Sequence, residues 1–554
     1  MKTVIVGGVA GGASTAARLR RLDEHGEIII FERGEYVSFA NCGLPYYIGN
    51  VITKKEHLLL QTPESFDARF QVEVRILSEV TSIDPNNKTV TVHNLRTGED
   101  YQESYDRLVL SPGAEPIIPG FVPSDSKRIF TLRTINDTLK IKDALQQQQV
   151  KSAVVIGGGY IGIEMVENLH KAGVDVTIIE LADHIINAFD GDMASFLQQH
   201  LRSKGVQLRL QEKVLSLEES ADKITVVTDK GSLDTDFVLL SVGVRPENKL
   251  AQEAGLKLAG NGCIAVNEHL ETSAKDIYAL GDAVAVQHFV SGQTTYIPLA
   301  GPANRMGRIV ADNIAGINST YQGTQGTSIL KCFDLTAACT GLNEKSLQAS
   351  NYNYEKIYIE PASHATYYPG AQKVYLKLLF SKDTGLIFGA QLVGNDGIDK
   401  RCDVLATAIR AKMTVYDLIH LELCYAPPFS SAKDPVNVAG LVAENILAGR
   451  IDIFHYDLYP SLNPEEVTLL DVRTVKENEK GKIPNTINIP LDSLRSRLHE
   501  LDPQKTIYVN CLGGLRSYVA CRILTQHGFT CKNLSGGYLY WKTFTDEQKL
   551  LQNS

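Results

Sequence analysis

Residues 153–162 read AVVIGGGYIG, an apolar run that ends in a glycine-rich turn. Ala153–Ile156 has the β-branched composition of a strand, and Gly157–Gly162 is typical of a tight turn. Ile163–Ala172 follows with helical spacing, and Val176–Glu180 is again strand-like. The order strand, turn, helix, strand is the repeating unit of a parallel sheet covered by helices. This stretch therefore predicts an α/β fold.

The glycine spacing of this turn indicates a dinucleotide site. Gly157, Gly159 and Gly162 occupy all three positions of the GxGxxG pattern, where backbone N–H groups and a helix N-terminus can approach a pyrophosphate. Glu180 ends the next strand, where a carboxylate can accept hydrogen bonds from ribose hydroxyls. Because a carboxylate there would repel a 2′-phosphate, the sequence favours NADH over NADPH.

The N-terminus carries a second copy of the same unit. Its expected elements are a strand over Lys2–Val6, a turn over Gly7–Gly12, a helix over Ala13–Leu22 and a strand over Ile28–Glu32. Gly7 and Gly12 hold the outer glycine positions, Val9 replaces the middle glycine, and Glu32 supplies the acid. Two copies in one chain predict two nucleotide sites.

Two further segments indicate which cofactor each copy binds. Thr272–Asp282, which ends in Gly-Asp, resembles the second flavin-contacting segment of flavoproteins with two dinucleotide domains, in which the Asp binds the ribityl chain. Ser111–Ala114 is similar to the hinge of the same proteins. The resemblance implies FAD on the first copy, with Asp282 as a ligand, and the nicotinamide cofactor on the second copy.

A single cysteine follows the first unit, in the sequence SFANCGLPYYIG of residues 38–49. A cysteine near a flavin can pass electrons to a sulfur substrate by thiol–disulfide exchange, and its thiolate is the reactive form. Cys42 has no second cysteine at CxxC or CxxxxC spacing, so it must react with a small thiol or use an oxidised sulfur state.

With this motif, residues 1 to about 445 resemble the coenzyme A disulfide reductases, whose close relatives are NADH oxidases and peroxidases. The resemblance implies that Cys42 forms a mixed disulfide with coenzyme A and that Tyr367 and Tyr425 are active-site tyrosines reaching the partner subunit's cysteine. It also implies a homodimer with shared active sites. The implied coenzyme A contacts are Ser14, Arg18, Arg21, Ser38, Asn41, Asn304 and Lys433.

A second reactive cysteine lies near the C-terminus, in Cys511–Ser517, between an expected strand over Thr506–Asn510 and an expected helix around Ser517–His527. Small residues let successive N–H groups of such a loop point inward and stabilise a thiolate or persulfide, and Arg516 can complete this cradle. The loop resembles the rhodanese active loop, and the resemblance extends over Val467–Trp541. A phosphatase loop has one more residue between Cys and Arg, so sulfur transfer is favoured.

Composition excludes several other classes of function. The 554 residues are 44% hydrophobic and 21% charged, with a net charge of −9, which argues against nucleic acid binding. No apolar stretch is long enough for a membrane span. Nine scattered cysteines without a CxxC pair argue against a disulfide framework and against a metal site, and they favour a reducing compartment, the cytoplasm.

The predicted fold class is α/β, with two Rossmann-like dinucleotide-binding domains, an α+β dimerisation domain and a small α/β rhodanese domain. The expected boundaries are 1–112 with 246–320 for the FAD-binding domain, 113–245 for the NAD(P)H-binding domain, 321–448 for the dimerisation domain, 449–463 for a linker and 464–548 for the rhodanese domain.

The combined motifs predict an FAD-dependent NAD(P)H reductase that uses small thiol or persulfide substrates. A fused sulfurtransferase favours persulfides or polysulfides as substrates, with coenzyme A disulfide reduction as a related activity. Two alternatives stay open at this point. One is an NADH oxidase or peroxidase that uses a cysteine sulfenic acid, and the other is a carrier or sensor of sulfane sulfur.

Overall fold

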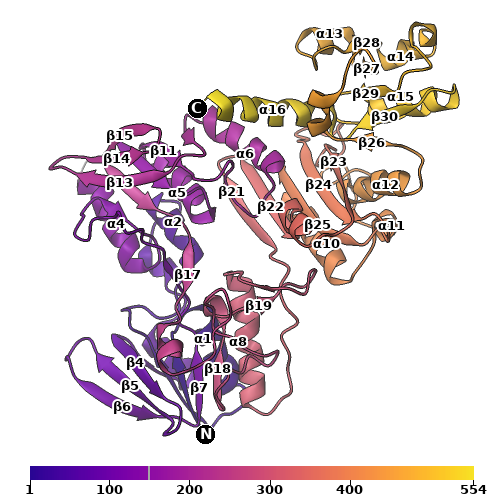
Figure 1. Ribbon diagram of the computed structural model, residues 1–554. Coiled ribbons are helices and arrows are strands. Elements are labelled where there is room, and N and C mark those ends of the chain that lie inside the picture. The colour runs from indigo at the N-terminus through magenta and orange to yellow at the C-terminus, as the bar shows by residue number, and fades with distance from the viewer. Residues whose placement is uncertain (148–149, 554) are drawn as a thin grey trace. The chain divides into compact units, whose positions relative to one another are not determined.

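The computed structural model describes residues 1–147 and 150–553, which fold into two compact units (Figure 1). The first unit contains Met1–Leu181 and Glu212–Gly326. The second contains Ala182–Gln211 and the chain from Thr327 onwards. The domain boundaries expected from the sequence stay a prediction, because compact units of this kind can each hold more than one domain.

A parallel five-stranded sheet forms the core of the first glycine unit. In spatial order its strands are β18 (Ile277–Ala279), β7 (Arg107–Leu110), β1 (Lys2–Val6), β2 (Glu27–Phe31) and β3 (Glu73–Arg75). Val4, Ile5 and Ile29 are fully buried, as expected for strands covered on both faces. Helices α1 (Ala10–Arg20) and α8 (Ala300–Ile314) pack against each other beside this sheet.

The second glycine unit is also built on parallel strands. β11 (Asp175–Ile179), β10 (Ser152–Ile156), β16 (Phe237–Leu240) and β9 (Ile129–Phe130) pair in that order, with helices α4 (Ile135–Gln147) and α5 (Tyr160–Lys171). Both glycine turns are shorter than predicted. Helix α1 begins at Ala10 instead of Ala13, and α5 at Tyr160 instead of Ile163, because the last glycine of each motif belongs to the first helical turn.

Smaller antiparallel elements complete the first unit. They are β4 (Ser78–Asp84), β5 (Thr89–Asn94) and β6 (Asp100–Ser104); β13 (Val214–Glu219), β14 (Ile224–Thr228) and β15 (Gly231–Thr235); β8 (Ala114–Pro116) with β17 (Val244–Pro246); and β19 (Val286–Gln287) with β20 (Thr294–Thr295). The short helices are η1 (Asn41–Gly43), α2 (Leu44–Ile48), η2 (Lys55–Leu58), α3 (Pro63–Phe70), α7 (Lys249–Glu253) and η3 (Gly281–Ala283).

The second unit contains an antiparallel five-stranded sheet with helices. The strands, in spatial order, are β21 (Ser328–Cys332), β22 (Leu335–Gly341), β25 (Ile387–Gly394), β24 (Val374–Ser381) and β23 (Tyr354–Ile359). The helices and one short strand are α6 (Gly191–Ser203), β12 (Gln207–Arg209), α9 (Glu344–Ala349), α10 (Ile398–Arg410), α11 (Val415–His420) and α12 (Pro435–Leu447). Strand β23 lies at one edge of this sheet.

The C-terminal part of the same unit is a parallel α/β layer. Its strands are β26 (Ile453–Phe454), β30 (Cys531–Leu534), β29 (Ile507–Asn510), β27 (Thr468–Asp471) and β28 (Ile487–Asn488). Its helices are η4 (Tyr456–Ser461), α13 (Val475–Glu479), α14 (Leu491–Leu494), η5 (Leu498–Glu500), α15 (Leu515–Gln526) and α16 (Gly537–Asn553).

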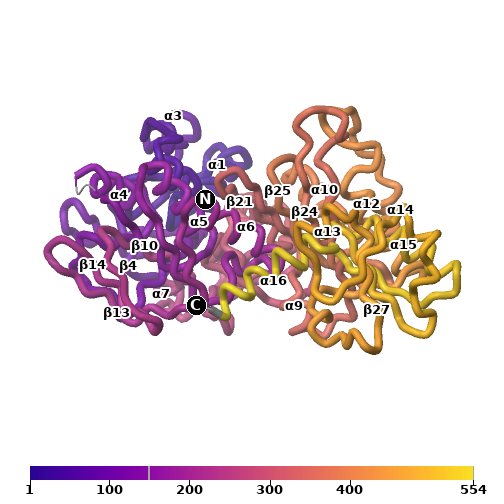
Figure 2. Tube along the Cα trace, turned by 90° about the horizontal axis from the view of Figure 1, so that it is seen from above, coloured from indigo at the N-terminus to yellow at the C-terminus, as the bar shows by residue number. Residues whose placement is uncertain are grey.

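Helix α16, the last element of the C-terminal layer, packs against α6. The two helices lie side by side in both views (Figures 1 and 2). Glu547 is 1% exposed and accepts hydrogen bonds from Arg202 at 2.6 Å and from Gln198 at 2.8 Å. Gln199 donates to the carbonyl of Thr543 at 3.0 Å. The C-terminal layer is therefore docked on the rest of its unit.

We expect Glu547→Gln to destabilise this docking by about 1–3 kcal/mol, because the substitution removes the charged acceptor from a buried network. Hydrogen exchange along α16, together with thermal unfolding, measures the effect. Asp546→Asn is the matched control, since Asp546 pairs with Lys542 on the exposed side of the same helix and should cost about 0.5 kcal/mol or less. Equal exchange in both variants would contradict the role of Glu547.

Candidate active sites

The two glycine turns have the same local geometry. The N–H of Gly8 donates to Glu32 Oε2 at 3.0 Å, and the N–H of Gly158 donates to Glu180 Oε2 at 2.6 Å. In each copy the acid at the end of the second strand thus contacts the turn that follows the first strand. This arrangement places the carboxylate beside the mouth of the turn, where a ribose would bind.

The shape of the second turn fits a bound pyrophosphate. A Cβ on Gly162 would lie 2.2 Å from the carbonyl oxygen of Gly157, so the turn and its helix require glycine there. A Cβ on Gly159, in contrast, would meet no atom within 4 Å. Gly159 therefore faces open space. Without a side chain there, the backbone of the turn can lie close to a bound pyrophosphate.

The first copy meets buried polar groups that fit a polar cofactor. Asp282 lies in η3 directly after β18, and burial raises its pKa to about 6, while Arg133 acts in the opposite direction. The hydroxyl of Tyr296 is buried without a hydrogen-bond partner in the described chain, and the charge of Asp282 helps to raise its pKa. Groups of this kind are suited to the hydroxyl-rich chain of a flavin.

Cys42 lies in η1, just before α2, and is solvent-exposed. The surrounding protein raises its pKa, first through desolvation and then through the negative charges of Glu164 and Asp282. The structure therefore brings Cys42 close to an expected flavin ligand and to helix α5 of the second glycine unit. The protein groups around Cys42 favour the thiol, although the sequence led us to expect a site that favours the thiolate.

Glu164 and Tyr46 belong to this site but were missed by the sequence analysis. Tyr46 donates to Glu164 Oε1 at 3.2 Å, and burial raises the pKa values of both groups. Glu164 lies two residues after Gly162 on α5. The available signal in the sequence was an acid among the apolar residues of this helix, and in the structure it is partly buried. Its contact with the Cys42 segment is tertiary and has no signature in the sequence.

Four of the residues implied as coenzyme A contacts lie on the packed helices α1 and α8. Ser14 donates to Asn304, and Arg18 forms an ion pair with Asp312 at 2.8 Å. Arg21 is exposed at the end of α1. The helices approach closely because Gly307 faces the backbone of Gly11. Arg18 is thus already paired within the protein, whereas Arg21 is solvent-exposed.

The other two implied contacts in the first unit, Ser38 and Asn41, precede Cys42 in the same segment. Asn41 is exposed beside Cys42. Ser38 is buried, has a positive φ of 47°, and donates its N–H to the carbonyl of Gly8 at 2.9 Å. The first glycine turn therefore fixes the start of the cysteine segment.

Tyr367 and Tyr425, both exposed, lie together in the second unit, with their hydroxyls 3.0 Å apart. Buried Arg401 holds their loops: it donates to the carbonyl of Ser363 at 2.6 Å and to Asp434 at 2.9 Å. Lys433, the remaining implied contact, is exposed next to Asp434. Arg401 and Asp434 are organising residues that the sequence analysis missed.

Cys511 lies immediately after β29 and is 1% exposed. Its sulfur accepts hydrogen bonds from the N–H of Gly514 at 3.1 Å and from the hydroxyl of Ser517 at 3.3 Å. These donors form the expected sulfur cradle at the start of α15. The guanidinium of Arg516 makes two hydrogen bonds of 2.7 Å to Glu477, so its charge is paired by a side chain that the sequence analysis did not single out.

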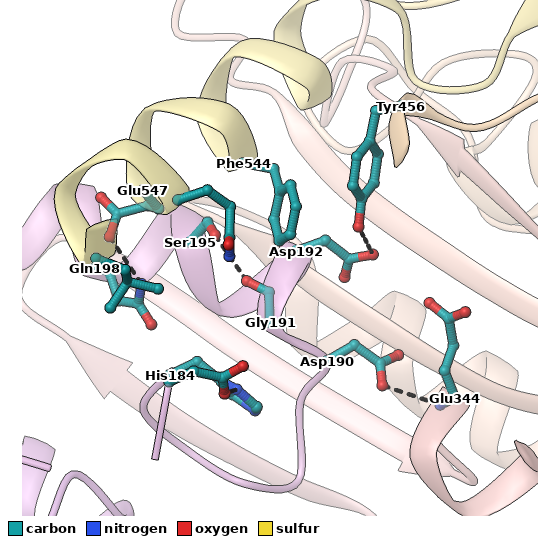
Figure 3. Close-up of a pocket in the computed structure, with 13 residues that line it drawn as sticks. His184, Asp190, Gly191, Asp192, Ser195, Gln198, Glu344, Tyr456, Phe544 and Glu547 are labelled. Carbon is teal, nitrogen blue, oxygen red and sulfur yellow. Dashed lines mark hydrogen bonds and ion pairs between the residues drawn. The ribbon is translucent and has the colours of Figure 1, made fainter. Parts of the chain in front are cut away.

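The second unit also contains a cavity of about 200 Å³ that none of the predicted site residues lines. Asp190, Asp192, Glu344 and Glu547 are among its walls, and Figure 3 shows Tyr456 directed toward Asp192. Fully buried Lys377 forms ion pairs with the first three of these acids. The acids are therefore partnered within the protein, and the cavity borders a structural charge network.

The described residues hold neither a membrane-spanning helix nor a cluster of metal ligands. Within residues 1–147 and 150–553, no helix is both long and apolar enough to cross a bilayer. In the same part of the chain, no group of three or more His, Cys, Asp or Glu side chains could hold a metal ion. The nine cysteines all lie in the described part of the chain, and none of them forms a disulfide.

Comparison with known families agrees with this arrangement. A family model described as pyridine nucleotide-disulphide oxidoreductase matches residues 1–307, and the dimerisation domain of the same family matches residues 327–435. The chain belongs to the pyridine nucleotide-disulphide oxidoreductases. A rhodanese-like domain matches residues 456–544. The predicted fold class and the prediction of a flavin- and nicotinamide-dependent oxidoreductase with a rhodanese domain are confirmed.

Individual members of this oxidoreductase family are similar over most of the chain. A coenzyme A disulfide reductase of Staphylococcus haemolyticus is 38% identical over 448 residues, which are 80% of this chain and all of that protein. The crystal structure of reduced Bacillus anthracis CoADR-RHD is 50% identical, with a TM-score of 0.96 over 99% of this chain and 98% of that one. A NAD-dependent persulfide reductase from A. fulgidus is 36% identical, with a TM-score of 0.92 over 98% and 100% of the two chains.

We expect Glu164→Gln to lower the pKa of Cys42, because burial raises this pKa first and the negative charge of Glu164 adds to the effect by disfavouring the thiolate. The alkylation rate of Cys42, followed by peptide mass mapping over a pH series, should then rise at lower pH than in the unmodified oxidoreductase. Asp175→Asn, at the exposed start of β11, removes a charge elsewhere in the same unit as a control. An unchanged profile in Glu164→Gln would show that this acid does not control the thiol.

Proposed function

We propose that this chain uses NADH to reduce persulfides or polysulfides, and also coenzyme A disulfide, at Cys42, with Cys511 supplying sulfane sulfur. The hydrogen-bonded cradle of Cys511 carries this proposal, because a buried sulfur that accepts from Gly514 and Ser517 is suited to hold a persulfide anion. The similarity to a coenzyme A disulfide reductase and to a persulfide reductase supports both substrate classes.

In this proposal NADH supplies the electrons, and two nucleotide sites hold the two cofactors. Gly157, Gly159, Gly162 and Glu180 would hold the nicotinamide cofactor, and Gly7, Gly12, Glu32 and Asp282 would hold FAD. A bound flavin provides a two-electron carrier between the nicotinamide and sulfur. The carboxylate of Glu180 favours NADH, since it would repel the 2′-phosphate of NADPH.

Cys42 is the nucleophile in both reactions. With coenzyme A disulfide, its thiolate attacks one sulfur, forms a mixed disulfide and releases one coenzyme A thiolate; two electrons then release the second. With a persulfide, Cys42 takes the outer sulfur while the thiol leaves, and two electrons with protons release sulfide. Burial, followed by the negative charges of Glu164 and Asp282, raises the pKa of Cys42 and so favours the thiol, which is less readily oxidised than the thiolate.

A further part of the proposal concerns the residues that would bind coenzyme A. We propose Ser14, Arg18, Arg21, Ser38, Asn41, Asn304 and Lys433 as its contacts, with guanidinium groups suited to phosphates. The paired hydroxyls of Tyr367 and Tyr425 would reach the cysteine of a partner subunit in a homodimer with shared sites. The absence of disulfides among the described cysteines fits a reducing compartment, and we propose the cytoplasm.

The test is anaerobic oxidation of NADH, and separately of NADPH, by the purified protein offered coenzyme A persulfide, coenzyme A disulfide or peroxide. We expect persulfide to be the fastest substrate, with one sulfide released for each NADH. Faster turnover of coenzyme A disulfide would make the enzyme mainly a disulfide reductase that maintains the thiol pool. Faster turnover of peroxide would assign sulfenic acid chemistry to Cys42, and slow substoichiometric NADH use would indicate a carrier or sensor.

Substitution of each cysteine in turn should distinguish the roles of Cys42 and Cys511. Cys42→Ser should retain FAD but lose reduction of every sulfur substrate, because no other thiol replaces the nucleophile. Cys511→Ser should reduce coenzyme A disulfide at the normal rate but lose most of its turnover with sulfane donors. Cys424→Ser, at another exposed thiol, is the control. Normal use of all sulfane donors by Cys511→Ser would contradict delivery through Cys511.

A further inference from the structure

The active loop of the C-terminal layer is in contact with a residue from the antiparallel sheet of the same unit. Glu360 directly follows edge strand β23, and its side chain is only 11% exposed. A Cβ built on Gly513 would lie 2.1 Å from Glu360 Oε1 and 2.4 Å from its carboxyl carbon. Because Gly513 stands two residues after Cys511, the carboxyl group of Glu360 lies directly against the loop that cradles the sulfur.

Contacts on both sides of Glu360 hold it in this position. The N–H of Tyr358 donates to Ser535 Oγ at 3.1 Å, and the hydroxyl of Tyr540 donates to the carbonyl of Ile359 at 2.9 Å. The rings of Tyr358 and Tyr540 also pack with their centroids 5.0 Å apart. The backbone before Glu360 is thereby attached to the turn after β30 and to α16, so the carboxyl group cannot easily move away from the loop.

The charges near the loop leave Glu360 incompletely neutralised. Lys373 pairs with Glu360 at 3.4 Å, but half of the lysine side chain is exposed, which weakens the pair. Arg516 lies near enough to lower the pKa of Glu360, yet its guanidinium is held by Glu477. Burial outweighs both cations and raises the pKa of Glu360. A carboxyl group that can both accept and release a proton thus lies at the Cys511 site.

We propose that Glu360 belongs to the sulfurtransferase site and selects sulfur donors, favouring thiol persulfides over the dianionic thiosulfate. The inference rests on the proposed function, in which Cys511 receives sulfane sulfur. The ionised carboxylate accepts a hydrogen bond from the S–H of a neutral persulfide, and it repels a donor that carries two negative charges next to the transferred sulfur.

The transfer is balanced without another reactant. The thiolate of Cys511 attacks the outer sulfur of R–S–S–H, a new S–S bond forms and the original S–S bond breaks. Glu360 carries the proton from the outer sulfur to the leaving thiolate, which departs as R–SH. Cys511 then holds a persulfide anion in the cradle of Gly514 and Ser517. Transfer from thiosulfate releases sulfite and needs no such proton.

Single-turnover loading of Cys511 in the full chain tests this assignment. Wild type, Glu360→Gln and the control Glu479→Gln, at an exposed acid on α13, are mixed with coenzyme A persulfide or with thiosulfate. The gain of one sulfur atom on the Cys511 peptide is followed by mass spectrometry. FAD content and NADH-dependent reduction of coenzyme A disulfide, which should not change, report on folding.

We expect Glu360→Gln to load from the persulfide about tenfold more slowly or worse, because general acid–base groups commonly contribute more than that. Loading from thiosulfate should rise by about tenfold as the like charge is removed. In the wild type, persulfide loading should increase with pH as Glu360 ionises, and the part of this rise that is due to Glu360 should be absent in Glu360→Gln. The glutamine variant keeps the side-chain volume, so these changes report on charge and proton transfer.

The outcomes separate this inference from the proposed function. Equal loading of wild type and Glu360→Gln by both donors, with the same pH dependence, would overturn the role of Glu360 and leave sulfur delivery by Cys511 intact. A wild-type Cys511 that takes sulfur from neither donor would overturn delivery itself, and the donor selection with it. A similar change in Glu479→Gln would show a general charge effect and overturn the specific assignment.

Discussion

A sulfur anion is stable inside a protein only where hydrogen-bond donors or positive charges replace the water that it loses. The two candidate cysteines, Cys42 and Cys511, differ with respect to that constraint. Cys511 is buried but accepts hydrogen bonds from Gly514 and Ser517, so its surroundings are prepared for an anion before any substrate binds. For Cys42, desolvation by the surrounding protein and then the negative charges of Glu164 and Asp282 raise the pKa and oppose ionisation. The surroundings of Cys511 are thus suited to a persulfide anion, whereas those of Cys42 favour the thiol.

Local backbone geometry was readable from the sequence because it depends on residues that are close along the chain. The two glycine turns, with Glu32 and Glu180 at the following strand ends, were predicted, and each acid contacts the turn of its own copy. The start of each helix was placed three residues too late. The GxGxxG spacing marks the turn, but it does not show that the last glycine already adopts helical geometry.

Contacts between distant segments could not be predicted in this way. Glu164 reaches the cysteine segment through tertiary packing, and Glu477 pairs with Arg516 from a separate short helix. Glu360 precedes Gly513 by a long stretch of chain and carries no motif of its own. Each of these residues is an ordinary acid in the sequence, and only the fold shows which sulfur or cation it faces. The recognisable motifs thus supply Asp282 and the donors Gly514 and Ser517, and acids outside the motifs complete the charge around both sulfur sites.

The docking of the C-terminal layer bears on how sulfur could travel. A domain that delivered sulfur by swinging on a linker would need weak, solvated contacts with its neighbours. Here Glu547 is buried against Arg202 and Gln198, and aromatic rings from α6, β23, β24 and α16 pack together. Such an interface resists separation, because opening it would expose a buried carboxylate and several aromatic surfaces. Movement of sulfur away from Cys511 then falls to a small carrier thiol. In the proposed function coenzyme A suits this task, since its long pantetheine arm holds the reactive sulfur far from its charged nucleotide end.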